Sequence, residues 1–169
     1  MPEIAYLVRG FLTVRSSPLR VPLAGSLTLR PDLGAGRFTG SLTLTPSTAS
    51  RTVLGISLFS STVEITADAP VTGRLSEDVG LFATVTVGAV IRAVRVLGWT
   101  VIGGGSCRTA GHATVPLRSA PGFRLDRGGR LTGRYDRPPF TGCGWATRLV
   151  NLLAAGPGNT VVIDLIPVT

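Results

Sequence analysis

The stretch from Arg37 to Thr45 reads Arg-Phe-Thr-Gly-Ser-Leu-Thr-Leu-Thr, and it decides the fold class. Phe38, Leu42 and Leu44 would point to one face of an extended strand, and the polar residues between them to the other. A period of two is typical of a β-strand with one buried face. Because similar short stretches recur along the chain, the sequence predicts a mainly β protein.

Further strands are expected on both sides of this stretch, separated by turns rich in Gly, Pro and Ser. The expected strands are Ile4–Arg15, Val21–Gly25, Ser26–Arg30, Thr52–Phe59, Thr62–Ala67, His112–Leu117, Arg130–Tyr135 and Thr160–Ile166, and Pro70–Leu75 is expected to be a further short strand or a connection. We expect Val21–Gly25 to be an edge and Gly10 to mark a bulge. Ser16-Ser17-Pro18 is expected to turn the chain.

Two segments differ from this simple alternating pattern. Leu81–Leu97 is rich in β-branched residues and predicts two strand segments bent at Gly88, although its second half also fits a helical stripe. Trp145–Ala155 is the one segment with clear helical spacing, and Gly156-Pro157-Gly158 would end it.

About ten strands and one short helix in 169 residues indicate a single all-β domain covering residues 1–169. We expect a two-layer antiparallel β-sandwich with Greek-key connections, with a flattened barrel as the alternative. No run of about 18 apolar residues is present, so we expect no membrane span.

The chain is strongly basic. All seventeen basic residues are Arg, and nine acids leave a formal net charge of +8. Such a surface attracts anions, so an anionic envelope polymer or a lipid is the expected partner, and nucleic acid is not. One segment concentrates the charge, with arginines at positions 118, 124, 127, 130, 134 and 137. Within it, Arg124, Arg127, Arg130 and Arg134 are the candidate anion-binding residues, the alternative being an ordinary solvated surface.

Cys107 and Cys143 are the two cysteines of the chain, and both lie in Gly-rich turns. Their number and spacing predict one disulfide, the alternative being two separate buried thiols. A bridge closing a loop of this length stabilises a fold by about 3–4 kcal/mol in the chain-entropy model.

Several short motifs resemble those of secreted actinobacterial proteins that have a single β-rich domain and no known function. They are Gly36–Pro46, Val53-Leu54-Gly55, Gly103–Thr109, Phe140–Gly144, Asn151-Leu152-Leu153 and Gly156–Thr160. The resemblance implies an extracellular location and supports the disulfide, but it implies no reaction. The strand-like start of the chain also leads us to expect a mature protein whose signal peptide has been removed.

A catalytic site is not expected. His112 is the single histidine, and a Ser-His-Asp triad would need it together with residues such as Ser106 or Ser119 and Asp126. No Gly-x-Ser-x-Gly elbow accompanies them, so we interpret His112 as a partly exposed residue at a strand end.

The acids Glu64, Asp68, Glu77 and Asp78 form the one local concentration of carboxylates. They could pair in a cleft or hold calcium weakly, but ordinary solvated acids are the simpler interpretation. Gly103-Gly104-Gly105 lacks the Lys-Ser/Thr of a phosphate-binding loop and indicates a tight turn. We therefore expect no metal and no cofactor.

These observations favour a non-catalytic, secreted or cell-envelope protein that acts by binding or by self-assembly through sheet edges into a homo-oligomer. The alternative is a carrier of a hydrophobic anionic ligand such as a lipid. Apolar strands would enclose the tail of that ligand, and the Arg-rich loop would hold its head group.

Overall fold

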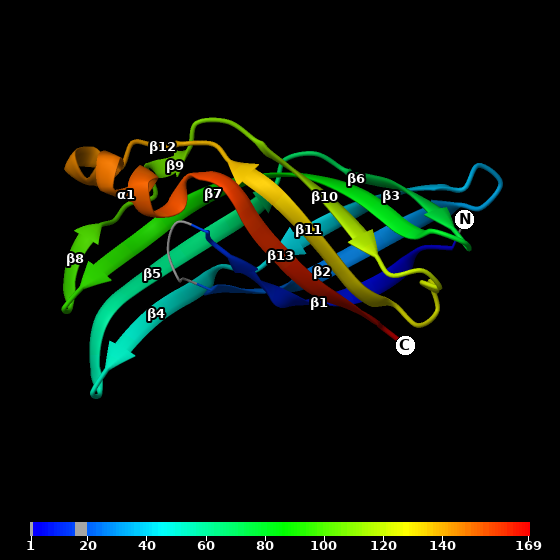
Figure 1. The fold of residues 1–169 in the computed structure, drawn as a ribbon, viewed down its shortest axis with the longest axis horizontal. Coiled ribbons are helices and arrows are strands. Elements are labelled where there is room, and N and C mark those ends of the chain that lie inside the picture. The colour runs from blue at the N-terminus through cyan, green and yellow to red at the C-terminus, as the bar shows by residue number, and fades with distance from the viewer. Residues whose placement is uncertain (1, 16–19) are drawn as a thin grey trace.

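A computed structural model describes residues 2–15 and 20–169 of the chain. Its strands form one sheet that closes into an antiparallel barrel of eight strands (Figure 1). The strands are β1 (Ile4–Thr13), β2 (Arg20–Asp32), β3 (Arg37–Leu44), β4 (Ser47–Val53), β5 (Ile56–Ala67), β6 (Val71–Ser76), β7 (Gly80–Val96), β8 (Trp99–Ile102), β9 (Cys107–Thr109), β10 (Ala113–Ser119), β11 (Gly129–Arg137), β12 (Phe140–Thr141) and β13 (Gly156–Pro167). A short helical segment, η1 (Gly144–Ala146) and α1 (Thr147–Ala154), precedes β13.

The all-β prediction with one short helix is confirmed, but the predicted sandwich is wrong. Around the barrel the strands follow the order β7, β10, β11, β13, β1, β2, β3, β6 and back to β7. The closing ladder pairs β10 with β7, from Ala113 opposite Val87 to Arg118 opposite Phe82. Because both edges of the sheet meet on β7, there is one enclosed interior instead of a space between two layers.

Glycines within the strands allow the sheet to curl this tightly. A Cβ atom on Gly10 would lie 2.0 Å from the carbonyl oxygen of Val162, and one on Gly25 would lie 2.0 Å from that of Thr43. Both positions therefore bring neighbouring backbones closer than any side chain permits. The expected bulge at Gly10 is wrong, since the register between β1 and β13 runs through it without a shift.

Beyond the barrel, the second half of β7 continues into a small extension. There it pairs with β5, and β4 and β8 complete two hairpins that project past the same end of the barrel (Figure 1). Thr52–Phe59 is consequently not one strand, because the chain reverses at Leu54-Gly55 between β4 and β5. Both ends of the chain lie toward the opposite end of the molecule (Figure 1).

Other expectations need smaller corrections. Val21–Gly25 and Ser26–Arg30 form one strand, β2, which lies inside the sheet between β1 and β3 and is not an edge. The stretch predicted as two bent segments is the single strand β7, which passes through Gly88. The turn expected at Ser16-Ser17-Pro18 lies outside the described residues.

The predicted disulfide is confirmed. It joins Cys107 on β9 to Cys143, just before η1, and thereby fixes the helical segment to the sheet. At the other end of the barrel, the buried hydroxyl of Tyr6 donates a hydrogen bond to the carbonyl of Leu125 at 2.6 Å and holds the loop before β11 in place. Burial is the main cause that raises the pKa of Tyr6, to about 12, and Asp126 adds to it.

No helix in the part of the chain that the structure describes has the length and hydrophobicity needed to cross a lipid bilayer.

Candidate functional site

The interior of the barrel contains an apolar cavity near the end from which the hairpins project. Its volume is about 70 Å³, and its wall includes Val8, Leu12, Val85, Val115 and Ile163. A smaller void of about 20 Å³ lies deeper, beside Leu29, Phe38 and Leu131. Close-packed interiors leave few voids larger than one water, which needs about 10–15 Å³. The barrel is therefore not completely filled by its own side chains.

One cationic side chain takes part in the wall of this cavity. Along β11, Leu131, Gly133, Tyr135 and Arg137 occupy every second position and so face inward, and the outward positions between them are polar. Arg137 is the last of the inward series and lines the larger cavity together with Tyr135. The alternation of the strand thus places a guanidinium beside an apolar space.

The guanidinium of Arg137 is held by two aromatic rings. Its Nη2 donates a hydrogen bond to the hydroxyl of Tyr135 at 2.7 Å. The guanidinium carbon lies 5.7 Å from the ring centre of Tyr135 and 6.0 Å from that of Phe140, which are cation–π distances. These contacts fix the orientation of the charge without neutralising it.

Within the described residues, Arg137 has no carboxylate partner. The neighbouring Asp136 accepts a hydrogen bond from the backbone N–H of Gly158 instead. Burial raises the pKa of Tyr135, and the opposing effect of Arg137 is smaller, so the phenol stays protonated and neutral at physiological pH. Arg137 therefore presents an uncompensated positive charge next to the cavity.

The four arginines predicted as an anion site lie elsewhere. Arg130 and Arg134 are on the outer face of β11, about 13 Å apart along the strand. Arg130 forms two hydrogen bonds with Asp164, at 2.8 and 3.1 Å, and these lower the pKa of that carboxyl. Arg124 is bound in the same way by Asp126, at 3.0 and 3.0 Å.

Arg127 lies in the turn with Arg124, where its backbone N–H bonds to the carbonyl of Arg124 at 3.2 Å. Two of the four predicted cations, Arg124 and Arg130, are thus already paired with carboxylates. The structure does not gather the four around one pocket, and anion binding by them stays a prediction.

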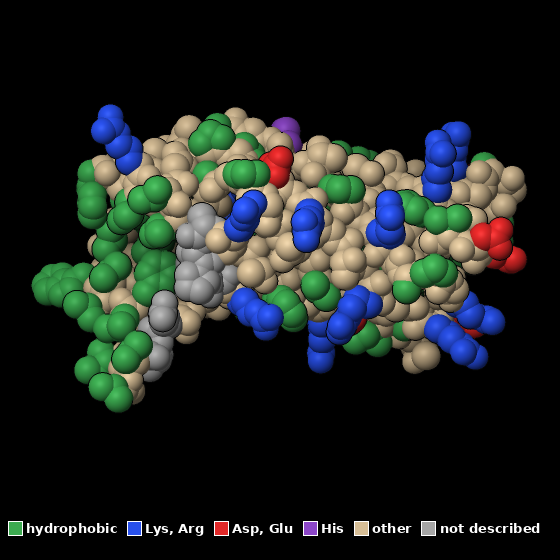
Figure 2. Space-filling model, in the orientation of Figure 1, with side chains coloured by type: hydrophobic (Ala, Val, Ile, Leu, Met, Phe, Trp, Pro, Cys, Tyr) green, Lys and Arg blue, Asp and Glu red, His purple; other side chains and the backbone are tan. Residues whose placement is uncertain are grey.

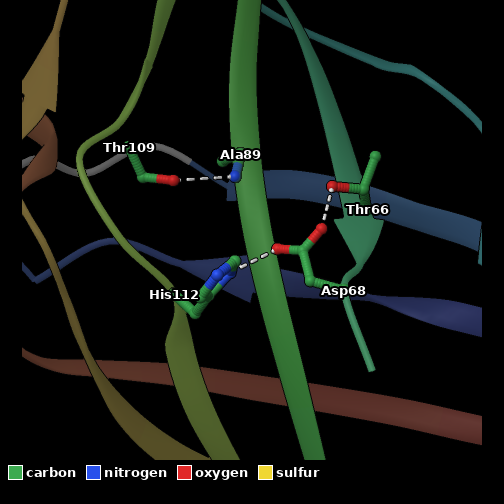
Figure 3. Close-up of polar contacts among 5 residues, drawn as sticks. All are labelled: Thr66, Asp68, Ala89, Thr109 and His112. Carbon is green, nitrogen blue, oxygen red and sulfur yellow. Dashed lines mark hydrogen bonds and ion pairs between the residues drawn. The ribbon is translucent and has the colours of Figure 1, made fainter. Parts of the chain in front are cut away.

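His112 forms a polar pair with Asp68 on the outer face of the barrel. Its Nδ1 lies 2.7 Å from Oδ2 of Asp68, and the hydroxyl of Thr66 donates to the other carboxylate oxygen at 3.1 Å (Figure 3). The two side chains meet across β7 at Gly88, where a Cβ atom would lie 2.7 Å from the carboxylate. The absence of a side chain at Gly88 therefore makes room for the pair.

The hydroxyls proposed as triad partners have other roles. The hydroxyl of Ser106 donates to the carbonyl of Gly142 at 2.8 Å. Ser119 accepts from the N–H of Leu81 and donates to the carbonyl of Ala120, both at 2.8 Å. Ser119 is also seven strand residues from His112, about 23 Å. The side chain of His112 is 64% exposed and is paired with Asp68 alone among the described residues.

The acidic residues also lie apart. Glu64 pairs with Arg92 at 2.7 Å and Asp68 with His112, and Glu77 and Asp78 lie in the exposed turn between β6 and β7. Among residues 2–15 and 20–169, no group of three or more His, Cys, Asp and Glu side chains could hold a metal ion. Nothing in this part of the surface resembles a paired-carboxylate cleft.

The sequence contains one signal for Arg137, namely its position in the alternation of β11. Extending the alternation of Arg130–Tyr135 by one step would have placed Arg137 on the inward face, where a charge is unusual. No protein-family model, no curated protein and no solved structure matches this chain. The chemistry of the cavity is therefore inferred from the residues of the barrel.

Proposed function

We propose that this chain is a non-catalytic binding protein of the cell envelope, and that its barrel holds a small hydrophobic molecule with an anionic group. The observation that carries the proposal is the apolar cavity with the unpaired charge of Arg137 in its wall. An eight-stranded barrel has an interior wide enough for either packed side chains or one small ligand. Here the side chains leave a space.

The size of the cavity limits the ligand. At about 70 Å³ it is smaller than the roughly 150 Å³ apolar cavity that accommodates benzene, so it suits the end of a chain, a few methylene groups long, and not a whole lipid tail. The guanidinium of Arg137 keeps further N–H donors, which suit a carboxylate. A short straight-chain carboxylic acid is the simplest molecule that meets both conditions.

The location is proposed on separate grounds. Disulfides persist in oxidising compartments, so the Cys107–Cys143 bridge supports an extracellular or envelope position. The resemblance to secreted actinobacterial proteins supports the same location. The pairing of His112 with Asp68 on the open outer face gives no support for catalysis, and for this reason a binding role is preferred.

Self-assembly is the second candidate. Closing the barrel pairs both edges of eight strands, whereas β4, within the part of the chain that the structure describes, has a ladder of backbone hydrogen bonds along one edge, to β5. An edge strand of this kind can pair with a second copy. A molecular mass that rises with protein concentration in light scattering would favour this candidate over the ligand-binding one.

Ligand binding is tested with straight-chain carboxylates of increasing length, from butanoate to decanoate, by isothermal titration calorimetry. Each additional buried methylene should tighten binding about fourfold until the cavity is full. Arg137→Gln should weaken binding of the acids, and the methyl esters should bind the natural protein weakly. Arg134→Gln is the matched control, because Arg134 is on the same strand but faces outward.

A second variant tests the cavity itself. Ala113 is buried and lines the cavity, so Ala113→Val places two methyl groups in the space and should block the ligand while keeping the fold. Native mass spectrometry of protein secreted by an actinobacterial host adds an independent test, since a bound ligand would appear as extra mass that is lost on denaturation. Equal binding by the natural protein, Arg137→Gln and Ala113→Val would refute the proposal.

A further inference from the structure

One end of the molecule is covered with hydrophobic side chains, and we call it the apolar end (Figure 2). It comprises the two hairpin tips and the exposed face of the helical segment. Its large exposed residues are Val53, Leu54, Ile56, Leu58, Val96, Leu97, Trp99, Trp145, Leu149, Leu152 and Leu153. Single exposed hydrophobic residues are normal on a protein surface, but a continuous apolar patch marks an interaction site.

The three parts of the apolar end are neighbours. The N–H of Leu97 at the tip of the β7–β8 hairpin donates to the carbonyl of Leu58 in the β4–β5 hairpin at 3.1 Å. The segment η1, which contains Trp145, packs against β8, which begins with Trp99. Both hairpin tips and α1 lie at the same end of the molecule (Figure 1).

The hairpin tips carry leucine where the backbone disfavours it. Each tip is a two-residue turn with both residues at positive φ: Leu54 at 51° and Gly55 at 78°, then Leu97 at 51° and Gly98 at 81°. Turns of this type strongly prefer Asn-Gly, since a branched side chain is strained in the left-handed region. Leu54 is 97% exposed, so packing within the chain does not explain its presence. Strained exposed residues of this kind indicate a function outside the fold.

The segments that form the apolar end carry arginines and no acidic residues. The segments that build it, residues 47–63, 89–109 and 140–159, contain no Asp or Glu, and their arginines are Arg51, Arg92, Arg95, Arg108 and Arg148. Arg92 pairs with Glu64 at the base of the extension. Arg95, Arg108 and Arg148 are exposed and have no carboxylate partner among the described residues.

We propose that the apolar end docks on an anionic lipid surface. The leucines of the hairpin tips insert among the acyl chains, and the two tryptophans lie at the level of the head groups, where their amphipathic rings are favoured. The exposed arginines contact lipid phosphates. Charge complementarity selects lipid as the occupant, because a second copy would bring the same positive charges to the same contact.

This docking is independent of the ligand site in the barrel. The cavity is lined by residues of the barrel wall and Arg137, and none of the exposed residues of the apolar end contributes to that wall. Loss of ligand binding in Arg137→Gln would leave docking unaffected, and loss of docking would leave ligand binding unaffected. An experiment that refutes ligand binding in the barrel would therefore leave the docking proposal standing, and the reverse also holds.

The protein contains its own optical probe of docking. Its two tryptophans, Trp99 and Trp145, are both in the apolar end and are 79% and 80% exposed. Vesicles of phosphatidylcholine with phosphatidylglycerol should shift their fluorescence to shorter wavelength, and brominated acyl chains should quench it. Vesicles of phosphatidylcholine alone should bind several-fold more weakly, and salt should reduce the difference by screening.

The informative variant is the double substitution Leu54→Asn with Leu97→Asn. Because Asn suits both turn positions, the variant should fold at least as well as the natural protein, so a loss of binding cannot be ascribed to unfolding. Its vesicle partition coefficient should fall more than tenfold in sedimentation. Arg95→Gln and Arg148→Gln should each lower binding to anionic vesicles about fivefold.

Leu33→Asn is the matched control. Leu33 is 72% exposed in the turn between β2 and β3, away from the hairpin tips. The Leu33→Asn variant should therefore bind vesicles as the natural protein does. Equal loss of binding in Leu33→Asn and in the tip variant would overturn the proposal, as would the absence of any vesicle-induced fluorescence shift. So would a lipid-free dimer that the tip variant abolishes, because the occupant of the apolar end would then be a second copy.

Discussion

Replacing Leu54 by Asn should stabilise the protein, although it removes a large hydrophobic side chain. Leu54 has a φ of 51°, and the left-handed region costs an ordinary L-residue about 1–2 kcal/mol, a penalty that Asn largely avoids. At 97% exposure the leucine side chain contributes almost no buried area that could be lost. We therefore expect the free energy of unfolding to rise by about 1 kcal/mol.

Urea unfolding followed by circular dichroism measures this change, and the melting temperature should rise by about 2–4 °C for a chain of this length. Leu33→Asn makes the same chemical change at an exposed position without a positive φ and should leave the unfolding free energy within about 0.5 kcal/mol. A Leu54→Asn variant that is no more stable than the natural protein would refute the strain argument. The inference that leucine is kept there for binding would then lose its main support.

Three further predictions concern the barrel. Replacing both cysteines by serine should lower the free energy of unfolding by about 4 kcal/mol, because the bridge spans 36 residues; unchanged urea midpoints in the variant would contradict this. Gly25→Ala should cost about 3 kcal/mol in thermal unfolding, since its Cβ would lie 2.0 Å from the carbonyl oxygen of Thr43. The hydrogen bonds from Arg130 hold the pKa of Asp164 below its ordinary range, so their stabilisation is present above about pH 4 and lost as the pH falls further. Asp164→Asn should therefore lose less stability than the natural protein between about pH 5 and pH 2 in urea titrations, and identical pH profiles would count against the pair.

The local structure could be predicted well from the sequence because each signal was local. Alternation in Arg37–Thr45 identified β3, and the spacing after Trp145 with the following Gly-Pro-Gly identified the helix. The strand and the helix depend on neighbours in the chain, and the periodicity of side chains records such neighbours directly. The disulfide joins residues 36 apart, and it was predicted instead from the number and spacing of the two cysteines.

Barrel closure could not be read from alternation, because a strand in a sandwich and a strand in a barrel both bury every second residue. The distinguishing signal was the set of glycines inside the strands, including Gly10, Gly25, Gly73 and Gly133. We interpreted Gly10 as a bulge, whereas in the structure such glycines mark close backbone approach between curled strands. Which strand pairs with which is set by long-range contacts, and one sequence does not contain that information directly.

The candidate site was missed for a similar reason. The local density of positive charge favoured Arg124, Arg127, Arg130 and Arg134, but Arg124 is paired with Asp126 in the same turn and Arg130 with Asp164 on β13. The candidate site residue, Arg137, is identified by its position on the inward side of β11 and not by the local number of charges. In the same way, Val53-Leu54-Gly55 was interpreted as part of the continuous strand Thr52–Phe59, because apolar residues seldom occupy an exposed tight turn.

The length of β7 sets a distance between the two proposed binding regions. Seven residues separate Ala89, in the cavity wall, from Val96 beside the hairpin tip, which corresponds to about 23 Å of extended chain. With its hairpin tips inserted in a bilayer, the protein would project from the membrane, and its cavity would lie in the aqueous layer beyond the head groups. A molecule reaching Arg137 would then arrive from solution, and the protein would sample the medium beside the membrane while remaining attached to it.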